Sequence, residues 1–256
     1  MEKTNYALIG DIHSQIYPLE QAIAYCKTNN LRPIFLGDVF DSRCDTSDSV
    51  AVYHLLREVQ TTMNAVVLRS NHQDKLERYL KGNSVRVAIE LQRSIDDFAA
   101  SEVPAEELLQ WMESLPYGFC FKQDGVEYRC AHAYFPSWLE VDYETETLVL
   151  DAPRKARQLM MYGPQDKVTR QRVFWWQKPS ERSWTRVAGH YHVIHCEGKN
   201  LVLDGGCGSK DRSWFCREQP CLVLYDLSAG KLLEFDTRTT VVREPEPQGS
   251  VFSLSV

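Results

Sequence analysis

Three short runs of aliphatic and β-branched residues lie in the first third of the chain, and a polar cluster follows each of them. They are residues 6–9, 33–36 and 65–68. Continuous apolar runs of this length are typical of strands that are buried on both faces. Apolar residues at helical spacing lie between them, from Pro18 to Cys26 and over residues 45–62. The order strand, helix, strand, helix, strand predicts a parallel α/β core.

The pattern changes after the third strand. Residues from about 74 to 116 predict a helical insert. Six later segments predict a second, mostly antiparallel sheet; they are residues 117–121, 126–131, 185–188, 201–203, 221–225 and 231–235. We therefore expect one domain over residues 1–242, with two sheets and with helices outside them. A loosely ordered tail is expected over residues 243–256.

The composition is that of a globular protein with one large core. The chain has 256 residues, of which 43% are hydrophobic and 25% charged, and its net charge is −6. An acidic chain disfavours a surface for long duplex nucleic acid, and the apolar runs are too short to span a membrane. Eight cysteines without paired spacing predict reduced thiols. With no secretory leader in the N-terminal residues, we expect a cytoplasmic protein.

Charge is distributed unevenly in the middle of the chain. Residues 137–151 contain five acidic residues and no basic one. Residues 154–186 contain nine basic residues against two acidic ones, with several aromatic residues among them. Two interpretations stay open for the basic segment: a solvated face above core aromatics, or a rim that draws an anionic substrate toward a cleft.

Five of the seven histidines lie in polar clusters at the ends of predicted strands, where α/β folds place their sites. Asp11 and His13 are two positions apart, and so are His190 and His192. Residues with this spacing point the same way in an extended chain. Two imidazoles on one side of a strand end favour a metal site over a structural role.

The other clusters allow more than one interpretation. Asp38 and Asp41 follow the second strand, and they could shape a turn as well as bind a cation. Asn71 and His72 follow the third strand; Asn71 offers an oxygen ligand but could also cap the next helix. A lone histidine at a strand end, such as His132, is more often structural.

Taken together, the donors form an oxygen- and nitrogen-rich set without cysteine. The set is Asp11, His13, Asp38, Asn71, His132, His190 and His192. Mixed carboxylate, amide and imidazole ligands suit Mn, Fe, Zn, Ni or Mg rather than a thiolate zinc site. Seven ligands are too many for one ion and fit two, with one carboxylate between them. Asp38, after the middle strand of the first three, is the natural bridge.

The order of these motifs, DxH, GDxxD, NH, H and GHxH, resembles the signature of the calcineurin-like metallophosphoesterase superfamily from Gly10 to about Gly208. Motifs around Tyr162, Arg172 and Asp204 look like the phosphatase domain of bacterial polynucleotide kinase-phosphatase. They are also similar to the diadenosine tetraphosphatase and small bacterial serine/threonine phosphatase branches. The resemblance implies an α/β fold, a four-layer α/β/β/α sandwich of two mixed sheets. It also implies two divalent ions, with manganese favoured and iron, zinc, nickel or magnesium as alternatives.

The resemblance also implies a role for each site residue. One metal would be held by Asp11, His13, Asp38 and His192, and the other by Asp38, Asn71, His132 and His190. An aspartate at the position of Asp204 is a ligand in one subfamily, so Asp204 competes with His192.

Three further residues carry the catalytic and substrate-binding expectations. His72 matches a histidine that stabilises the transition state or protonates the leaving oxygen, and Asp41 orients it. Ser42 stands where the phosphoprotein phosphatases have arginine, and Arg43 follows it. Arg43 is therefore the candidate for holding phosphate.

The expected activity follows from the charge of the cations. Two divalent ions polarise a phosphoryl oxygen and lower the pKa of a bridging water, so we expect hydrolysis of phosphomonoesters by a metal-bridging hydroxide. The expected substrate is a small nucleotide, an RNA end or a phosphoprotein loop. One alternative is symmetric hydrolysis of diadenosine tetraphosphate. Another is a non-catalytic scaffold of the same fold, which typically lacks the second histidine or several ligands.

Overall fold

Alternation along the first strand shows how the layers are built. In β1 (Asn5–Ile9), Ala7 and Ile9 pack against helices, whereas Tyr6 and Leu8 pack against the second sheet. Successive side chains of a strand point to opposite faces, so one strand contributes to two cores. The structure is a computed structural model, and it describes residues 4–44, 46–142, 145–178, 181–209, 220–236 and 242–243.

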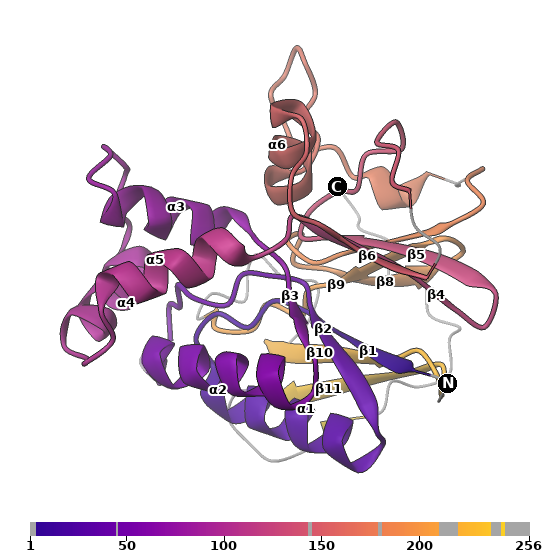
Figure 1. Cartoon of the computed structure of the whole chain (residues 1–256). Helices are drawn as coiled ribbons and strands as arrows, with labels where there is room; N and C mark the ends of the chain where they lie inside the picture. Colours follow the sequence, from indigo (N-terminus) through magenta and orange to yellow (C-terminus); the bar gives the residue numbers. More distant parts are fainter. Residues whose placement is uncertain are drawn as a thin grey trace.

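The first sheet has the strand order β12-β11-β10-β1-β2-β3 (Figure 1). Its other strands are β2 (Leu31–Phe35), β3 (Val66–Val67), β10 (Cys221–Asp226), β11 (Lys231–Asp236) and β12 (Val242–Arg243). β1, β2 and β3 are parallel, as the sequence predicts. The placement of residues 221–225 and 231–235 in the second sheet is wrong, because β10 pairs antiparallel with β1. An apolar pattern predicts a strand but does not identify its partner.

The second sheet has the order β6-β4-β5-β7-β9-β8. Its strands are β4 (Gly118–Gln123), β5 (Val126–Ala131), β6 (Glu146–Val149), β7 (Thr185–Ala188), β8 (Ile194–Glu197) and β9 (Asn200–Leu203). β5, β7 and β9 are parallel, whereas the other three pairings are antiparallel, so this sheet is mixed with a majority of antiparallel pairs. The sequence analysis missed β6 and β8, two short edge strands, of which β6 lies in the acidic segment.

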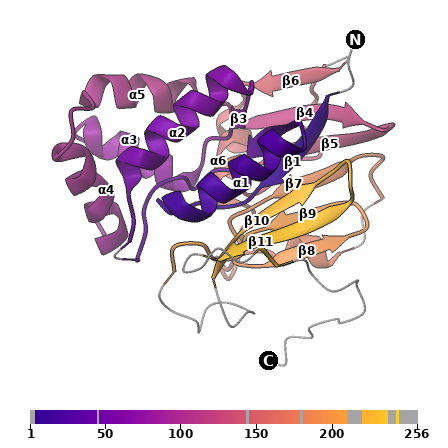
Figure 2. The same ribbon diagram turned by 90° about the horizontal axis from the view of Figure 1, so that it is seen from below.

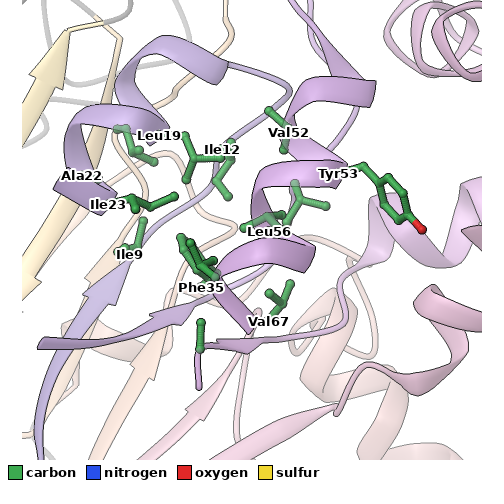
Figure 3. Packing of buried hydrophobic residues seen from close by; sticks show 14 of the residues in the cluster. Ile9, Ile12, Leu19, Ala22, Ile23, Phe35, Val52, Tyr53, Leu56 and Val67 are labelled. Carbon is green, nitrogen blue, oxygen red and sulfur yellow. The ribbon is translucent and has the colours of Figure 1, made fainter. Parts of the chain in front are cut away.

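Helices cover the outer faces of the two sheets, which completes the predicted four-layer arrangement. α1 (Ile16–Thr28) and α2 (Ser49–Thr62) pack on the first sheet, and α6 (Arg154–Tyr162) packs on the second (Figure 1). Figure 3 shows Ile9, Phe35 and Val67 of the first sheet facing the helical residues Ile23 and Leu56. Burying one such aliphatic side chain contributes about 1.5–3 kcal/mol. The expectation of two mixed sheets between helical layers is confirmed.

Three helices form a lobe beside the sheets (Figure 2). They are α3 (Asn71–Leu80), α4 (Ile89–Ala99) and α5 (Ala105–Ser114). Ser70, not Asn71, caps α3, because the Ser70 side chain accepts a hydrogen bond from the backbone N–H of Gln73. Asn71 is the first helical residue, so its side chain is available for another contact. A one-turn 3-10 helix, η1 (Trp175–Gln177), follows α6 in the chain.

Within the described ranges, no helix combines the length and the apolar character that crossing a bilayer requires. None of the seven described cysteines is in a disulfide bond, and five of them are buried. The predicted tail begins inside β12 at Arg243, and its remaining residues, from 244, lie outside the described residues.

Candidate metal centre

The candidate residues follow strands from both sheets whose carboxyl ends meet. In the first sheet, β1 leads to Asp11 and His13, β2 to Asp38, and β3 to Asn71. In the second sheet, β5 leads to His132, β7 to His190 and β9 to Asp204. Parallel strands present their carboxyl ends at one edge of a sheet, so two stacked sheets bring six strand ends to one place.

The first donor group contains Asp11, His13 and Asp38, whose ligand atoms all lie within 4.8 Å of one another. His13 Nδ1 lies 3.1 Å from the carbonyl oxygen of Phe40 and 2.7 Å from that of Asp41. Carbonyl oxygens only accept hydrogen bonds, so Nδ1 carries a proton and donates it. Burial lowers the pKa of His13, which leaves a lone pair on Nε2 facing Asp38 Oδ2 at 3.8 Å.

The second donor group contains Asp38, His132 and His190, again within 4.8 Å. His132 Nδ1 donates to the carbonyl oxygen of Leu36 over 2.9 Å, which turns Nε2 toward the group. That nitrogen lies 2.8 Å from Asn71 Oδ1, 3.0 Å from His190 Nδ1 and 3.4 Å from Asp38 Oδ1. Several potential ligand atoms thus converge on one point, and Asp38 belongs to both groups.

Three buried atoms that could ligate a metal have no hydrogen-bond partner among the residues that the structure describes. They are Asp11 Oδ1, Asp38 Oδ1 and His190 Nε2. A buried polar atom without a partner is unfavourable, and a buried charge is more so. Divalent cations would satisfy all three atoms, and carboxylate oxygens and imidazole nitrogens are suitable ligands for them. The residues present therefore fit metal ions.

The pKa shifts of the buried carboxyl groups also favour a bound cation. Burial raises the pKa of Asp11, and the neighbouring carboxylates of Asp204 and Asp38 raise it further. Burial alone would raise the pKa of Asp38 too, but the imidazoles of His132 and His72 hold it well below its usual range. Several carboxylates thus share one buried volume, and like charges at this spacing need a positive charge between them.

The backbone is strained at the same positions. φ is positive at five candidate site residues: +47° at His13, +43° at Asp38, +66° at Asp41, +72° at His190 and +54° at His192. Residues with side chains rarely adopt this left-handed conformation, and each instance costs of order 1–3 kcal/mol. Such strain is concentrated where function fixes the direction of a side chain.

His72 and Asp41 form a pair beside the shared carboxylate. His72 Nδ1 donates a hydrogen bond to Asp41 Oδ2 over 2.7 Å, and His72 Nε2 lies 3.9 Å from Asp38 Oδ2. Burial alone would lower the pKa of His72, but the carboxylates of Asp38 and Asp41 raise it to about 9. The ring therefore presents a protonated Nε2 toward the donor groups.

His192 and Arg43 also lie outside the two donor groups. The His192 side chain is 37% exposed; its backbone N–H donates to Asp204 Oδ2 over 2.6 Å, and its Nδ1 lies 3.4 Å from the same oxygen. Arg43 is half exposed and pairs with Glu90 of α4, with Nη2 3.3 Å from Oε1. The sequence analysis missed Glu90, which lies in the helical insert and carries no motif.

Gly189 provides space for the first donor group. A Cβ atom at this position would overlap Oδ1 of Asp11, and the next residue, His190, donates its backbone N–H to Asp11 Oδ2 over 2.9 Å. We expect Gly189→Ala to displace the Asp11 carboxylate and to weaken any binding of a divalent cation about 10- to 100-fold, as when the support of a ligand is lost. Isothermal titration with Mn²⁺ measures this.

Gly125→Ala, in the β4–β5 turn, is the matched control. A Cβ there meets nothing within 4 Å, but φ is +77°, so the change lowers the stability of the fold and leaves metal affinity unchanged. Wild-type affinity in Gly189→Ala would show that Asp11 is not confined as described.

Comparison with known proteins adds similarity in sequence and in fold. No model of a known protein family matches the chain. The asymmetrical bis(5′-nucleosyl)-tetraphosphatase PrpE of Oceanobacillus iheyensis is 24% identical over 227 residues, which cover 78% of this chain and 83% of that protein.

Solved structures share the architecture. A protein provisionally described as a diadenosine tetraphosphatase aligns with a TM-score of 0.53 and 19% identity, over 91% of this chain and 94% of that one. A cold-active protein-tyrosine phosphatase from a psychrophilic Shewanella aligns with a TM-score of 0.51 and 15% identity, over 95% and 80%. In the order of its motifs and in its two mixed sheets, the chain resembles the calcineurin-like metallophosphoesterases.

Proposed function

We propose that the chain is a phosphoesterase that holds two divalent cations, manganese favoured, and hydrolyses phosphomonoesters of small nucleotides, RNA ends or phosphoprotein loops. The observation that carries this proposal is the membership of Asp38 in both donor groups. One carboxylate with two oxygens can contact two cations, which is how paired-metal sites are joined.

Each ion would have its own ligands from this chain. The first would be held by Asp11, His13 and Asp38, with His192 or Asp204 completing the set. The second would be held by Asp38, Asn71, His132 and His190. When bound, divalent cations supply Lewis acidity, which stabilises negative charge on a phosphoryl oxygen and makes water a nucleophile near neutral pH.

The chain's own residues supply the proton and hold the substrate. Asp41 fixes His72 through Nδ1, so the Nε2–H of His72 donates a proton to the leaving oxygen. Arg43 releases Glu90 and then binds the phosphate of the substrate. Its present ion pair is half exposed, and exposed pairs contribute at most about 1 kcal/mol, so an anionic substrate competes with Glu90 readily.

A second candidate substrate is a bis(5′-nucleosyl) tetraphosphate. The relative from Oceanobacillus iheyensis carries that activity in its name, with asymmetrical cleavage, whereas the motifs alone suggested symmetric cleavage. Product analysis separates the two: symmetric hydrolysis of diadenosine tetraphosphate gives two molecules of ADP, and asymmetric hydrolysis gives ATP and AMP.

Turnover in the presence and absence of metal tests the proposal. Purified protein is expected to hydrolyse p-nitrophenyl phosphate with Mn²⁺, and EDTA is expected to abolish the activity reversibly. The same assay with phosphopeptides, 5′-mononucleotides, RNA 3′-phosphates and diadenosine tetraphosphate ranks the substrates. If the protein binds metal but hydrolyses none of these substrates, the proposed enzymatic activity is rejected and a non-catalytic scaffold of the same fold is supported.

We also infer a cytoplasmic location. None of the seven described cysteines is in a disulfide bond, and these include the partly exposed Cys44 and Cys196. Reduced thiols persist in the cytosol, whereas exported proteins tend to pair them. Thiol titration of freshly isolated protein without reductant would show seven or more free thiols, and extensive pairing would contradict the inference.

A further inference from the structure

A row of aromatic rings leads from the metal centre to the surface. The His190 ring packs on Tyr191 at 5.0 Å between centroids, Tyr191 on Trp176 at 4.5 Å, and Trp176 on Phe174 at 5.3 Å. Tyr191 and Trp176 are buried, but Phe174 is 51% exposed. The row therefore connects one exposed aromatic face to a candidate metal ligand through two buried rings.

The backbone before Phe174 is held in a defined conformation. Residues 164–173 form a hairpin-like loop in which Gln165 pairs with Arg172 and the N–H of Val173 donates to the carbonyl of Pro164 over 3.0 Å. Asp166 closes the tip of the loop by accepting hydrogen bonds from the N–H groups of residues 168 and 169. An exposed aromatic ring on a supported loop loses little entropy when it binds a flat partner.

The same segment borders the site on its other side. Tyr162, at the end of α6, donates its hydroxyl hydrogen to Asp74 of α3 over 2.7 Å, and α3 also carries Asn71 and His72. Residues 162–176 therefore reach from the helix that carries two candidate site residues to the ring beside His190. The segment is thus in contact with two parts of the chain that carry candidate site residues.

Charge on the segment suits a polyphosphate. It carries Lys167, Arg170 and Arg172 against one acid, Asp166, whose carboxylate is already bonded within the loop. Arg172 is exposed and has no ion pair among the described residues, and its pairing with Gln165 holds it in the loop that precedes Phe174. The guanidinium is therefore available to an anionic group of a ligand that contacts Phe174.

The structure offers a contrasting hollow that lacks these features. It is lined by residues 139–142 and 147–151 and includes three acids, Glu140, Asp142 and Asp151, but no base. An acidic lining repels polyphosphates, so charge alone distinguishes the two places.

We propose that Phe174 stacks on a nucleobase while Arg172 binds the phosphate next to the one held at the metal centre, so that residues 162–176 select nucleotides. This inference rests on the proposed function and narrows it to nucleoside phosphates. Stacking on an aromatic ring tolerates any base, because every base has a π-face. Guanidinium binds phosphate well through its planar set of donors.

Equilibrium binding to the manganese-loaded protein tests the proposal without relying on turnover. We expect Phe174→Ala to raise the Kd of ADP about 10- to 100-fold, in line with the loss of one base–aromatic stack. The Kd of inorganic phosphate, which has no base, stays unchanged. Phe174→Trp keeps a stacking face and restores binding of ADP. Arg172→Gln weakens ADP more than AMP, because AMP lacks the second phosphate.

Trp138→Ala is the matched control. Trp138 is an exposed aromatic residue of similar exposure, 50%, with Lys155 5.9 Å from its ring, but it belongs to no ring row that leads to His190. Its removal leaves both dissociation constants unchanged. Equal affinity for ADP and phosphate in the wild type, or an unchanged ADP affinity in Phe174→Ala, overturns the inference.

Hydrolysis of phosphoserine, which has neither a base nor a ring, separates this inference from the proposed function. If phosphoserine is hydrolysed but nucleotide binding does not depend on the base, the proposed phosphoesterase activity stands and the proposed nucleotide subsite is rejected. If ADP binding depends on the base but no phosphoester is hydrolysed, the proposed subsite stands and the proposed phosphoesterase activity is rejected.

Discussion

Asp38→Asn is expected to abolish turnover and to lower the metal content of the protein at both positions. Asp38 is the residue common to the two donor groups, and it is buried. Asparagine keeps one acceptor oxygen but replaces the other by an NH2 group. An amide NH2 has no lone pair available for a cation, so one of the two contacts is lost. We expect kcat to fall by at least about 10³-fold, the upper end of what the loss of one preorganised group costs.

Metal analysis after equilibrium dialysis against Mn²⁺ and steady-state kinetics measure the two effects together. Asp226→Asn is the matched control, because Asp226 is also a buried carboxylate but lies opposite Ala7 and accepts a hydrogen bond from the Tyr25 hydroxyl over 3.0 Å. It is expected to change thermal stability and not metal content. Full activity in metal-loaded Asp38→Asn would refute the bridging role.

His72→Ala is expected to keep the metal and to lose most of the turnover. The His72 ring is fixed by Asp41 and faces the shared carboxylate, but it belongs to neither donor group. Removing a general acid costs about 10²- to 10⁴-fold in kcat. Asp41→Asn leaves the imidazole in place but loosens its orientation, so we expect a smaller loss, about 10- to 100-fold.

A substrate with a good leaving group separates proton donation from a structural effect. Such a substrate needs no proton on the leaving oxygen, so the loss in His72→Ala shrinks with p-nitrophenyl phosphate and stays large with an alkyl phosphate. His54→Ala, on the exposed face of α2, is the control and leaves both rates unchanged. An equal loss for both substrates, or loss of manganese from His72→Ala, would argue against the acid role.

The sequence predicted the strands better than their partners. Residues 6–9, 33–36 and 126–131 carry strong local patterns, and β1, β2 and β5 form there. Pairing depends on contacts between distant segments, so the position of β10 beside β1 has no local signal. β6 lies in a stretch of exposed and acidic residues, where edge strands often carry charge and the apolar pattern is weak.

The positions of the candidate ligands were easier to predict than the strand pairing, because each candidate follows a strand end. The i, i+2 spacing of Asp11 and His13 identified a pair that the structure brings together with Asp38. The spacing argument is less successful for His192, whose side chain lies against Asp204 outside both donor groups. φ is positive at both His190 and His192, so the chain is not extended there and the i, i+2 argument does not apply.

The position of β1 between β2 and β10 has a consequence for folding during synthesis. β2 emerges from the ribosome soon after β1, but β10 begins only at residue 221. At about 5–20 residues per second, one edge of β1 waits roughly 10–40 s for its partner. An unpaired edge of a hydrophobic strand is prone to aggregation, so the nascent chain carries this hazard over that interval.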